Sequence, residues 1–345
     1  MVIRTISLVL AGSEGPQLRS LTTNLPAALL PIGGLFRAVD FTMSALLNSN
    51  LRRIYLLGGY RSDKLQAYFR DAWTQLSKEF RWDLDEDLTC LPPEDHPGGY
   101  LGLIEKSKAD HVLVASGDQV HQMDFGQLLR YHVDKQADIT LAGVPGVFVF
   151  RRDTLVELLR KSSGKATSFQ SLATSALAKR GRIVTWAFRG YWRSIDSIEA
   201  YHSVNMDLLE NRSDFDPYAG IPFPVRMLSG TRQLEQSRFA SDSRVALGAR
   251  LFSCNIRHSI VSAGARVDAG AEVVNCVILG GSHISSGARI RNAVIAENAT
   301  VRPGCEIGVE PMNSAVSLVD TITEPVRPPH RRSARVALRL CGTMH

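Results

Sequence analysis

The sequence predicts two domains of different architecture. Residues 1–215 are expected to form a doubly wound, Rossmann-like α/β domain, and residues 241–312 a left-handed parallel β-helix. In the first part, short β-rich runs alternate with helical stretches, which is typical of a parallel sheet covered by helices. In the second part, aliphatic residues recur at every fifth or sixth position, which is typical of a solenoid. The Pro- and Gly-rich residues 216–240 between them indicate a linker.

The α/β domain is expected to place its functional groups just after its strands. The strands are predicted at residues 6–10, 53–57 and 111–115, with helices at residues 41–50 and 63–80. The first strand runs into a turn that contains Gly12 and Gly15, and the third ends at Ser116, Gly117 and Asp118. Ligands of doubly wound sheets bind beyond the carboxyl ends of the strands. We therefore expect a ligand site between the Gly12 turn and Asp118.

The predicted β-helix rests on a register that returns every 17 residues. Its aliphatic positions follow gaps of six, six and five residues, namely Val261, Val267, Val273, Ile278, Ile284, Ile290, Ile295, Val301 and Ile307. The earlier residues Val245, Leu251 and Ile256 fit the same scheme. Glycines stand between the aliphatic positions, where sharp turns need them: Gly248, Gly264, Gly270, Gly287 and Gly304. Each coil is then expected to bury one aliphatic side chain per face.

The bulk composition is that of a globular protein, with 44% hydrophobic and 21% charged residues among 345. No apolar run approaches the ~18 residues that span a bilayer. The apolar run at residues 6–10 is too short for the core of a signal peptide, so we expect a cytoplasmic protein without a membrane segment. The five cysteines show no metal-binding spacing, and those of the repeat region, Cys254, Cys276 and Cys305, are expected to be buried inert thiols.

Much of the net charge of +6 lies near the end of the chain, at residues 327–339. We expect residues 313–345 to form a basic, flexible extension. The alternative is a module that binds nucleic acid or an anionic partner. No aromatic residues alternate with these arginines, which argues against nucleic acid.

Five blocks of sequence resemble one family, the glucose-1-phosphate adenylyltransferases. The blocks are LAGSEGPQLRSLT (residues 10–22), IGGLFRAVDFTMS (32–44), NSNLRRI (48–54), SGDQVHQMDF (116–125) and GYWRSIDSIEAY (190–201). The first is similar to the nucleotide loop LAGGxGxRLxxLT of sugar-phosphate nucleotidyltransferases. The others are similar to FGGxxRxIDFxLS and its continuation, SGDHIYxMDY and YWRDVGTxEAY of the family. The family also carries a C-terminal left-handed β-helix.

The resemblance implies that ATP and glucose 1-phosphate would react to ADP-glucose and pyrophosphate, for glycogen or starch synthesis. The sugar phosphate attacks the α-phosphorus of ATP in line. Such chemistry needs cations around the phosphate oxygens, a Gly-rich loop for close backbone approach and Mg²⁺ held by carboxylates. Gly12, Gly15 and Asp118 are what this chain retains of that nucleotide site, and Asp118 would be its first Mg²⁺ ligand.

The chain departs from the family at charged positions of the pocket. Ser13 replaces the second loop glycine, Gln17 the loop arginine, Ala27 a lysine, and Ser194 the second metal-binding carboxylate. Asp196 lies two residues further on, and Glu14 adds a negative charge beside the expected triphosphate. The family's GTADA segment has no match, and the long segment with its EKP motif is missing after Pro145. No catalytic residue is therefore expected to be retained with its role, and a second Mg²⁺ ligand is lacking.

Several residues have alternative interpretations. Asp118 is either a weak metal ligand or the N-cap of the helix at residues 123–125. Arg37 either forms a structural ion pair with Asp40 or, as the resemblance implies, belongs with Thr22 to a site for a sugar-phosphate effector, in which Asn24 replaces a lysine. His258 and His283 in the repeat region fit the general base of a hexapeptide acyltransferase, but exposed turn residues explain them more simply.

These patterns favour a non-catalytic, regulatory subunit. It would assemble as a homo- or hetero-oligomer, a tetramer in this family, with a catalytic paralogue, and ATP or a sugar phosphate would be its effector. An active enzyme with slow turnover or altered sugar 1-phosphate specificity is the alternative, and a binding module that uses the basic extension is the third.

Overall fold

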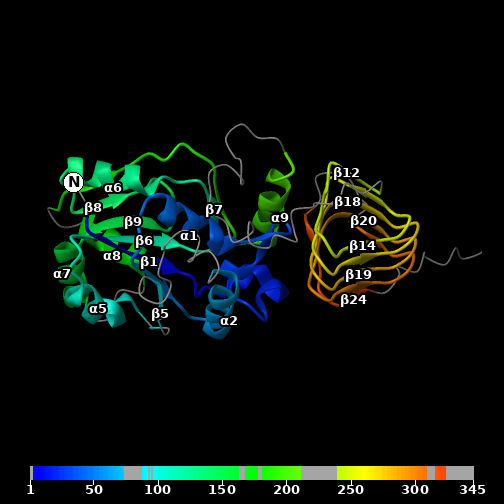
Figure 1. The fold of residues 1–345 in the computed structure, drawn as a ribbon, viewed down its shortest axis with the longest axis horizontal. Helices are drawn as coiled ribbons and strands as arrows, with labels where there is room; N and C mark the ends of the chain where they lie inside the picture. The colour runs from blue at the N-terminus through cyan, green and yellow to red at the C-terminus, as the bar shows by residue number, and fades with distance from the viewer. Residues whose placement is uncertain are drawn as a thin grey trace, which may run out of the picture.

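The computed structural model describes residues 3–73, 88–91, 94, 96–162, 168–177, 181–210, 239–308 and 315–323. Within them, an α/β unit and a β-helix lie end to end (Figure 1). Most of the predicted linker, the basic residues 327–345 and Cys341 lie outside the described residues.

The α/β unit is built on one central sheet of seven strands. Their spatial order is β10 (Ile183–Thr185), β8 (Ile139–Leu141), β9 (Val147–Arg151), β6 (His111–Ser116), β1 (Thr5–Leu10), β4 (Ile54–Leu57) and β5 (Leu88–Leu91). Strands β6, β1, β4 and β5 run parallel, as expected. Strand β9 runs antiparallel to both of its neighbours, which the sequence did not predict. Two short antiparallel ladders join β2 (Pro31–Ile32) to β3 (Phe36–Arg37) and β7 (Gln119–His121) to β11 (Trp192–Ser194).

Helices cover both faces of this sheet, which confirms the doubly wound fold. One face packs against α1 (Ala38–Asn48), α2 (Ser62–Tyr68), the π-helical η3 (Phe69–Trp73) and α6 (Phe125–Asp134). The other packs against η4 (Pro97–Tyr100), α5 (Leu101–Lys106), α7 (Arg152–Ser162) and α8 (Phe169–Leu177). The short 3₁₀ segments η1 (Pro16–Thr22) and η2 (Ala27–Leu29) follow β1.

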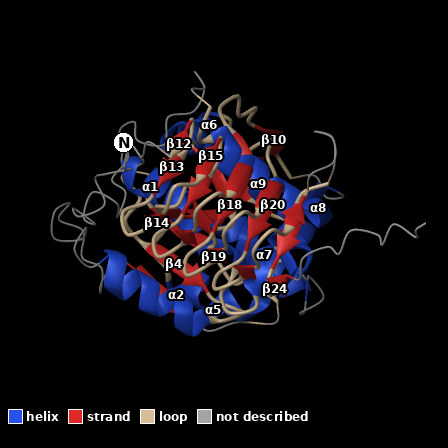
Figure 2. Ribbon diagram, turned by 90° about the vertical axis from the view of Figure 1, so that its right-hand side faces the viewer, coloured by secondary structure: helices blue, strands red, loops and turns tan. Residues whose placement is uncertain are grey.

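The second unit is a parallel β-helix with three faces, and Figure 2 shows its stacked coils from the side, in front of the α/β unit. One face stacks β12 (Ala240–Ser241), β15 (Asn255–Arg257), the first halves of β18 (Glu272–Ile278) and β20 (Arg289–Ile295), and β22 (Glu306–Ile307). The next stacks β13 (Arg244–Val245), β16 (Ile260–Val261), the second halves of β18 and β20, and β23 (Ser317–Val319). The third stacks β14 (Arg250–Leu251), β17 (Arg266–Val267), β19 (His283–Ile284), β21 (Thr300–Val301) and β24 (Ile322–Thr323).

The register confirms the 17-residue repeat read from the sequence. Val261 pairs with Ile278 and Ile278 with Ile295, while Val273 pairs with Ile290 in the adjacent face. These five side chains are fully buried. Gly264, at one corner of the stack, has a φ of +78°, a conformation that L-residues with a Cβ rarely adopt.

The two units share one hydrophobic core. Helix α9 (Ile198–Asp207) packs against β18 and β20, and the His202 Nε2 atom lies 2.8 Å from the carbonyl oxygen of Asn275. Phe36 and Tyr201 of the α/β unit belong to the same buried cluster as Ile260 of the β-helix. None of the helices in the described residues is long and apolar enough to cross a membrane.

Candidate nucleotide site

The Gly12 turn and Asp118 do meet at one edge of the sheet. Leu10 pairs with Leu57 on one side and with Ser116 on the other, so the three strands end at the same level. The backbone N–H of Gly117 donates to the carbonyl oxygen of Leu10 over 2.8 Å. The predicted ligand edge is thus present as a backbone arrangement.

Gly12 is required because two loops touch there. A Cβ atom on Gly12 would lie 2.5 Å from the backbone nitrogen of Gly59, which follows β4. The backbone N–H of Tyr60 also donates to the carbonyl oxygen of Gly12, at 3.1 Å. Gly15 has a φ of +63°, and the N–H of Leu18 donates to its carbonyl oxygen as η1 begins. The turn is therefore packed tightly, backbone against backbone, on the loop that follows β4.

The side chains of this turn carry no positive charge. Ser13, Glu14 and Gln17 are all exposed. Ala27 is fully buried, and its N–H donates to the carbonyl oxygen of Ser13 over 3.0 Å. Gln17 and Ala27 thus lie next to the turn, as expected from the family pattern. They present an amide and a methyl group where the family has an arginine and a lysine.

Asp118 sits beside the turn with one short hydrogen bond. The Ser116 hydroxyl donates to its Oδ1 over 2.5 Å. Burial raises the pKa of Asp118, and the negative charge of Asp196 raises that pKa further. The predicted N-cap role of Asp118 is wrong, because Asp124 caps α6 by accepting from the N–H of Gln127 at 2.9 Å.

Asp196 lies near enough to Asp118 for its charge to act on that carboxyl group. Strand β11 pairs with β7 so that Ser194 lies opposite Gln119, and the N–H of Ile195 donates to the carbonyl oxygen of Asp118 over 3.1 Å. This ladder holds the segment after Ser194 against Asp118, and the charge of Asp196 acts on the pKa of Asp118. Ser194 itself cannot ligate a metal as a carboxylate, so Asp196 is the second acidic group of this edge.

The donor set fits Mg²⁺ only when the ion arrives with a phosphate ligand. Mg²⁺ is commonly held by one or two carboxylates together with substrate phosphates. Asp118 and Asp196 supply that number, and no group of three or more His, Cys, Asp or Glu residues suited to a metal occurs among the described residues.

Gln119 is a buried residue of this edge that the sequence analysis missed. Its Oε1 accepts from the Trp192 indole N–H at 3.0 Å, and its Nε2 donates to the carbonyl oxygen of Pro145 at 2.8 Å. The amide therefore ties β11 to the shortened connection before β9. The signal was in the block SGDQVHQMDF, in which Gln119 stands at the histidine of the family's SGDHIYxMDY.

The residues of the expected effector region are engaged in local structure. The buried Thr22 hydroxyl donates to the carbonyl oxygen of Arg19 at 3.2 Å. An Arg37 Nη1 donates to the carbonyl oxygen of Leu29 at 2.9 Å. Asp40 accepts from the Arg37 backbone, from the Tyr68 hydroxyl and from the Trp73 indole N–H, rather than from the Arg37 guanidinium.

A hollow of about 230 Å³ lies between this region and the β-helix. Asn24 and Pro31 line it from the α/β unit, and Glu297 and Asp320 line it from the β-helix. Its lining includes neither Thr22 nor Arg37 and offers carboxylates to a ligand. This lining does not favour an anion.

The histidines and cysteines of the β-helix have structural roles. His258 occupies a left-handed corner with a φ of +45°, in line with Asn275 and Asn292 of the following coils. His283 Nε2 lies 2.7 Å from Asp268 Oδ2 on the outer surface. Cys254, Cys276 and Cys305 are buried thiols, as predicted, and burial raises the pKa of Cys276 to about 12.

Two family models match the chain. A model described as nucleotidyl transferase matches residues 6–146, and one described as GlmU-like, C-terminal hexapeptide matches residues 224–321. A glucose-1-phosphate adenylyltransferase 2 of Vibrio parahaemolyticus is 28% identical over 90% of this chain and 94% of the relative. A glucose-1-phosphate adenylyltransferase of Geobacter metallireducens is 25% identical over 89% and 92%, and that of Geobacillus stearothermophilus is 25% identical over 78% and 83%.

The chain is similar to glucose-1-phosphate adenylyltransferases over about nine tenths of its length. Both domain types and their order agree with the fold. The match with the Vibrio relative extends over 386 aligned positions, more than the 345 residues of this chain. The relative therefore carries segments that this adenylyltransferase-like protein lacks, in agreement with the missing segment after Pro145.

Proposed function

We propose that this adenylyltransferase-like protein has no appreciable turnover of its own and acts as a regulatory partner of an active paralogue in ADP-glucose formation. The observation that carries the proposal is the contrast at the Gly12 turn. The backbone of the turn contacts Gly59 at Gly12, as a tight loop requires. In contrast, Gln17 and the buried Ala27 stand where the family has an arginine and a lysine.

The magnitude of the loss supports a non-catalytic role. One electrostatic contact to a transition state is worth about 3–4 kcal/mol, or ~10²–10³ in rate. Here an arginine, a lysine and a carboxylate are missing from one site, at Gln17, Ala27 and Ser194. Although such losses are not additive, two of them would reduce turnover to the background.

The turnover test uses pyrophosphate release from ATP with a panel of sugar 1-phosphates. We expect background release from the unaltered chain. The double variant Gln17→Arg/Ser194→Asp restores two charges at positions that are not buried, and we expect it to raise release by a factor of about 10² or more. The matched control carries an added arginine and aspartate away from the site, at Gln170 and Ser171 of α8. Robust release by the unaltered chain would overturn the proposal.

The partnership test is co-expression with a catalytic paralogue from the same genome, followed by size-exclusion chromatography. We expect one mixed oligomer whose response to sugar-phosphate effectors differs from that of the catalytic chain alone. Two separate homomers under all conditions would end the regulatory proposal, whatever the turnover assay gives.

A slow sugar-1-phosphate nucleotidyltransferase is the second candidate, favoured by the approach of Asp196 to Asp118. In that case Asp118 and Asp196 would hold Mg²⁺ together with the phosphates of ATP, and the ion would supply charge to the leaving pyrophosphate. Substituting Asp196→Asn would then abolish the residual release, whereas Glu199→Gln, an exposed carboxylate on the following helix, would leave it unchanged. Release insensitive to Asp196→Asn would exclude this candidate.

A further inference from the structure

A polar hollow of about 960 Å³ opens at the edge of the sheet opposite the Gly12 turn. It is formed where β1, β6 and β8 begin, where β9 and α6 end, and where α7 starts. Its apolar lining is confined to small side chains such as Ala109, Val133 and Ala137. A hollow of this size and polarity suits a small hydrophilic molecule rather than an apolar one.

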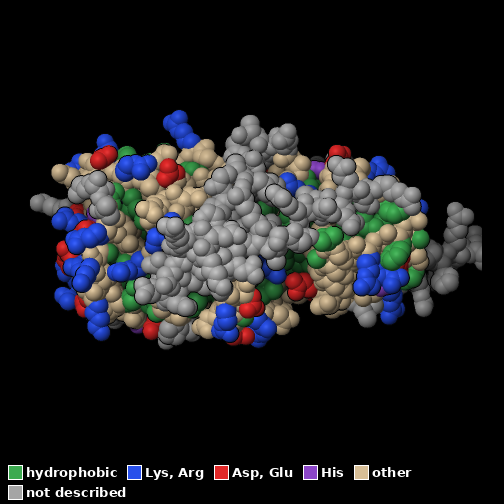
Figure 3. Space-filling model, in the orientation of Figure 1, with side chains coloured by type: hydrophobic (Ala, Val, Ile, Leu, Met, Phe, Trp, Pro, Cys, Tyr) green, Lys and Arg blue, Asp and Glu red, His purple; other side chains and the backbone are tan. Residues whose placement is uncertain are grey.

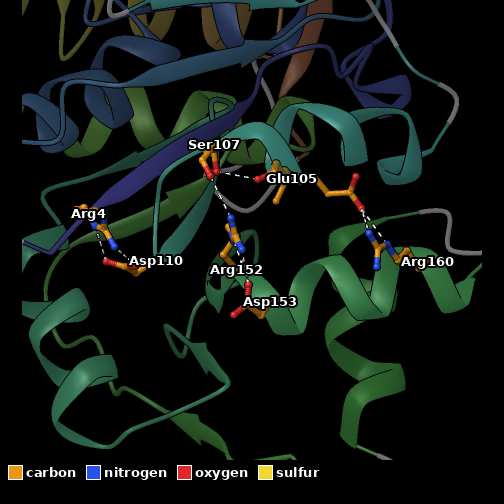
Figure 4. A network of polar contacts seen from close by, with 8 residues as sticks. Arg4, Glu105, Ser107, Asp110, Arg152, Asp153 and Arg160 are labelled. Atoms are coloured by element: carbon orange, nitrogen blue, oxygen red, sulfur yellow. Dashed lines mark hydrogen bonds and ion pairs between the residues drawn. The ribbon is translucent and has the colours of Figure 1, made fainter.

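Two of the arginines that line the hollow are held in place by carboxylates (Figure 4). The Arg4 guanidinium donates to both oxygens of Asp110, at 2.9 and 2.7 Å. The Arg152 guanidinium donates to Asp153 at 2.7 Å and to the carbonyl oxygen of Ser107 at 3.1 Å. The bidentate pair orients the Arg4 guanidinium, and these two arginines form opposite sides of the hollow.

Two further cations of the lining have no such partner. Arg151, at the end of β9, and Lys108, in the loop before β6, are exposed and make no ion pair with any residue that the structure describes. Among the described residues, the remaining carboxylate of the lining is that of Asp138, which accepts from the Thr154 hydroxyl and from the backbone N–H of Arg182. The hollow therefore holds positive charge that its own carboxylates do not neutralise.

The floor of the hollow carries a pair of uncharged histidines. The rings of His111 and His132 meet edge to face with centroids 5.0 Å apart. His132 Nδ1 lies 2.7 Å from the Thr140 hydroxyl, while His132 Nε2 and His111 Nδ1 are buried without a hydrogen-bond partner. Burial lowers the pKa of His132 to about 4, and the positive charge of Arg151 lowers it as well. A buried polar atom without a partner is destabilising, so a ligand group that reached these nitrogens would be favoured.

The N-terminus of α7 faces the same hollow. This helix has 11 residues and begins at Arg152, which lines the hollow with its neighbour Asp153. The first N–H groups of a helix and its macrodipole favour a negative charge. The N–H of Arg152 already donates to the carbonyl oxygen of Asp110 over 2.9 Å. The helix macrodipole and the cations of Arg151 and Lys108 therefore favour a negative charge in the hollow.

We propose that this hollow is a binding site for a small phosphate monoester. Arg151 and Lys108 would contact the phosphate, between the walls formed by Arg4 and Arg152, and the orphan imidazole nitrogens would bond the polar body of the ligand. Guanidinium groups recognise phosphate oxygens in a fork geometry, and the hollow has room for more than the phosphate alone. The site lies at the opposite edge of the sheet from Asp118, so it does not depend on the function proposed above.

The test is isothermal titration calorimetry of the full chain with glycerol 3-phosphate, and with glycerol as the uncharged control. We expect saturable binding of the phosphate monoester only. Substituting Arg151→Ala should weaken it about tenfold or more, since a hydrogen bond to a charged group is worth about 1.5–3 kcal/mol. Arg151→Lys should retain part of the affinity, and thermal unfolding of each variant shows that the fold is kept.

Arg160→Ala is the matched control. Arg160 is a cation of α7, the helix that follows Arg151, but it pairs with Glu105 outside the hollow (Figure 4). This variant should bind with affinity within about twofold of the unaltered chain. Equal losses in the Arg151 and Arg160 variants would mean non-specific attraction and would overturn the site. The absence of saturable binding to the unaltered chain would overturn it too, without bearing on the turnover or partnership tests.

Discussion

The β-helix and the Gly12 edge of the α/β unit differ in which part of the structure follows the family pattern. In the β-helix, the side chains follow it. Val273, Ile278 and Ile290 fill the coil interior without exposure, and the register pairs each with an aliphatic residue of the next coil. At the Gly12 edge, only the backbone follows the pattern, because Ser13 and Gln17 are exposed and bear no charge.

This difference teaches how the two regions constrain their sequences. A coil interior penalises every change of volume, because neighbouring coils are packed against it. In an exposed loop, a substitution lowers stability only when the backbone cannot accommodate it. A charged side chain is needed there only when a ligand requires it. Figure 3 shows one face of the molecule, on which Lys and Arg side chains gather at the outer end of the α/β unit and on part of the β-helix, beside exposed apolar side chains.

The largest effect is expected inside the β-helix. Ile278→Ala removes a fully buried side chain that pairs with Val261 and Ile295, and should lower the free energy of unfolding by about 2–5 kcal/mol. Denaturation in urea measures it. Val274→Ala, on the same strand but half-buried, is the control and should cost clearly less. Equal losses would contradict the assignment of Ile278 to the coil interior.

Acid should affect the α/β unit next most strongly. Burial lowers the pKa of His121 from 6.5 to about 4, so the unfolded chain binds a proton first as the pH falls. The stabilisation is present above pH 6.5, and about 3 kcal/mol of it is lost between pH 6.5 and 4. Unfolding in urea at several pH values should show this loss, and the loss should be smaller in the variant His121→Gln.

Asp40 opposes this acid effect. Burial raises its pKa from 3.8 to about 6, so the folded chain binds a proton first and gains stability as the pH falls from 6 to 3.8. Asp40→Asn removes that gain, and the acid loss should then become steeper than in the unaltered chain. A shallower loss would contradict the raised pKa.

A smaller effect is expected at the contact between the loops. Gly12→Ala would place a methyl group 2.5 Å from the backbone of Gly59 and should destabilise the chain by about 1–3 kcal/mol. Gly102→Ala is the matched control, because a Cβ there meets nothing within 4 Å and Gly102 lies in α5. It should stabilise the chain by about 0.5–1 kcal/mol. Thermal unfolding of both variants distinguishes close approach from a general cost of adding a methyl group.

The smallest effect is expected at the exposed loop side chains. Gln17→Arg should change the free energy of unfolding by no more than about 0.5 kcal/mol, because the side chain is exposed. A loss comparable to that of Gly12→Ala would show that Gln17 has a packing role and would weaken the contrast between the two regions.

The fold could be predicted from the sequence because its signals are periodic. The 17-residue spacing of Val261, Ile278 and Ile295 became a register, and the strand at residues 6–10 became β1. The antiparallel direction of β9 could not be predicted, since its residues, Val147–Arg151, read as a buried strand in either direction.

The site residues could be predicted only where a single segment of the sequence contains the pattern that identifies them. The turn at Gly12 and the position of Asp118 follow from strand ends. The approach of Asp196 depends on a ladder between β7 and β11, and the histidine pair joins the start of β6 to the end of α6. Residues that meet only through tertiary packing, such as His111 and His132, leave no local pattern. The partnership with a catalytic paralogue and the roles of Thr22 and Arg37 stay predictions.

The seam between α9 and the β-helix has a consequence for how this protein can be divided. Tyr201 and Phe36 face Ile260 within a single buried cluster, and His202 bonds across to Asn275. Cutting the chain between residues 210 and 239 and separating the fragments would expose a large apolar surface on each of them to water. Each half therefore depends on the other to cover its apolar surface. A chain that lost one half would need polar residues in place of the apolar ones at this contact.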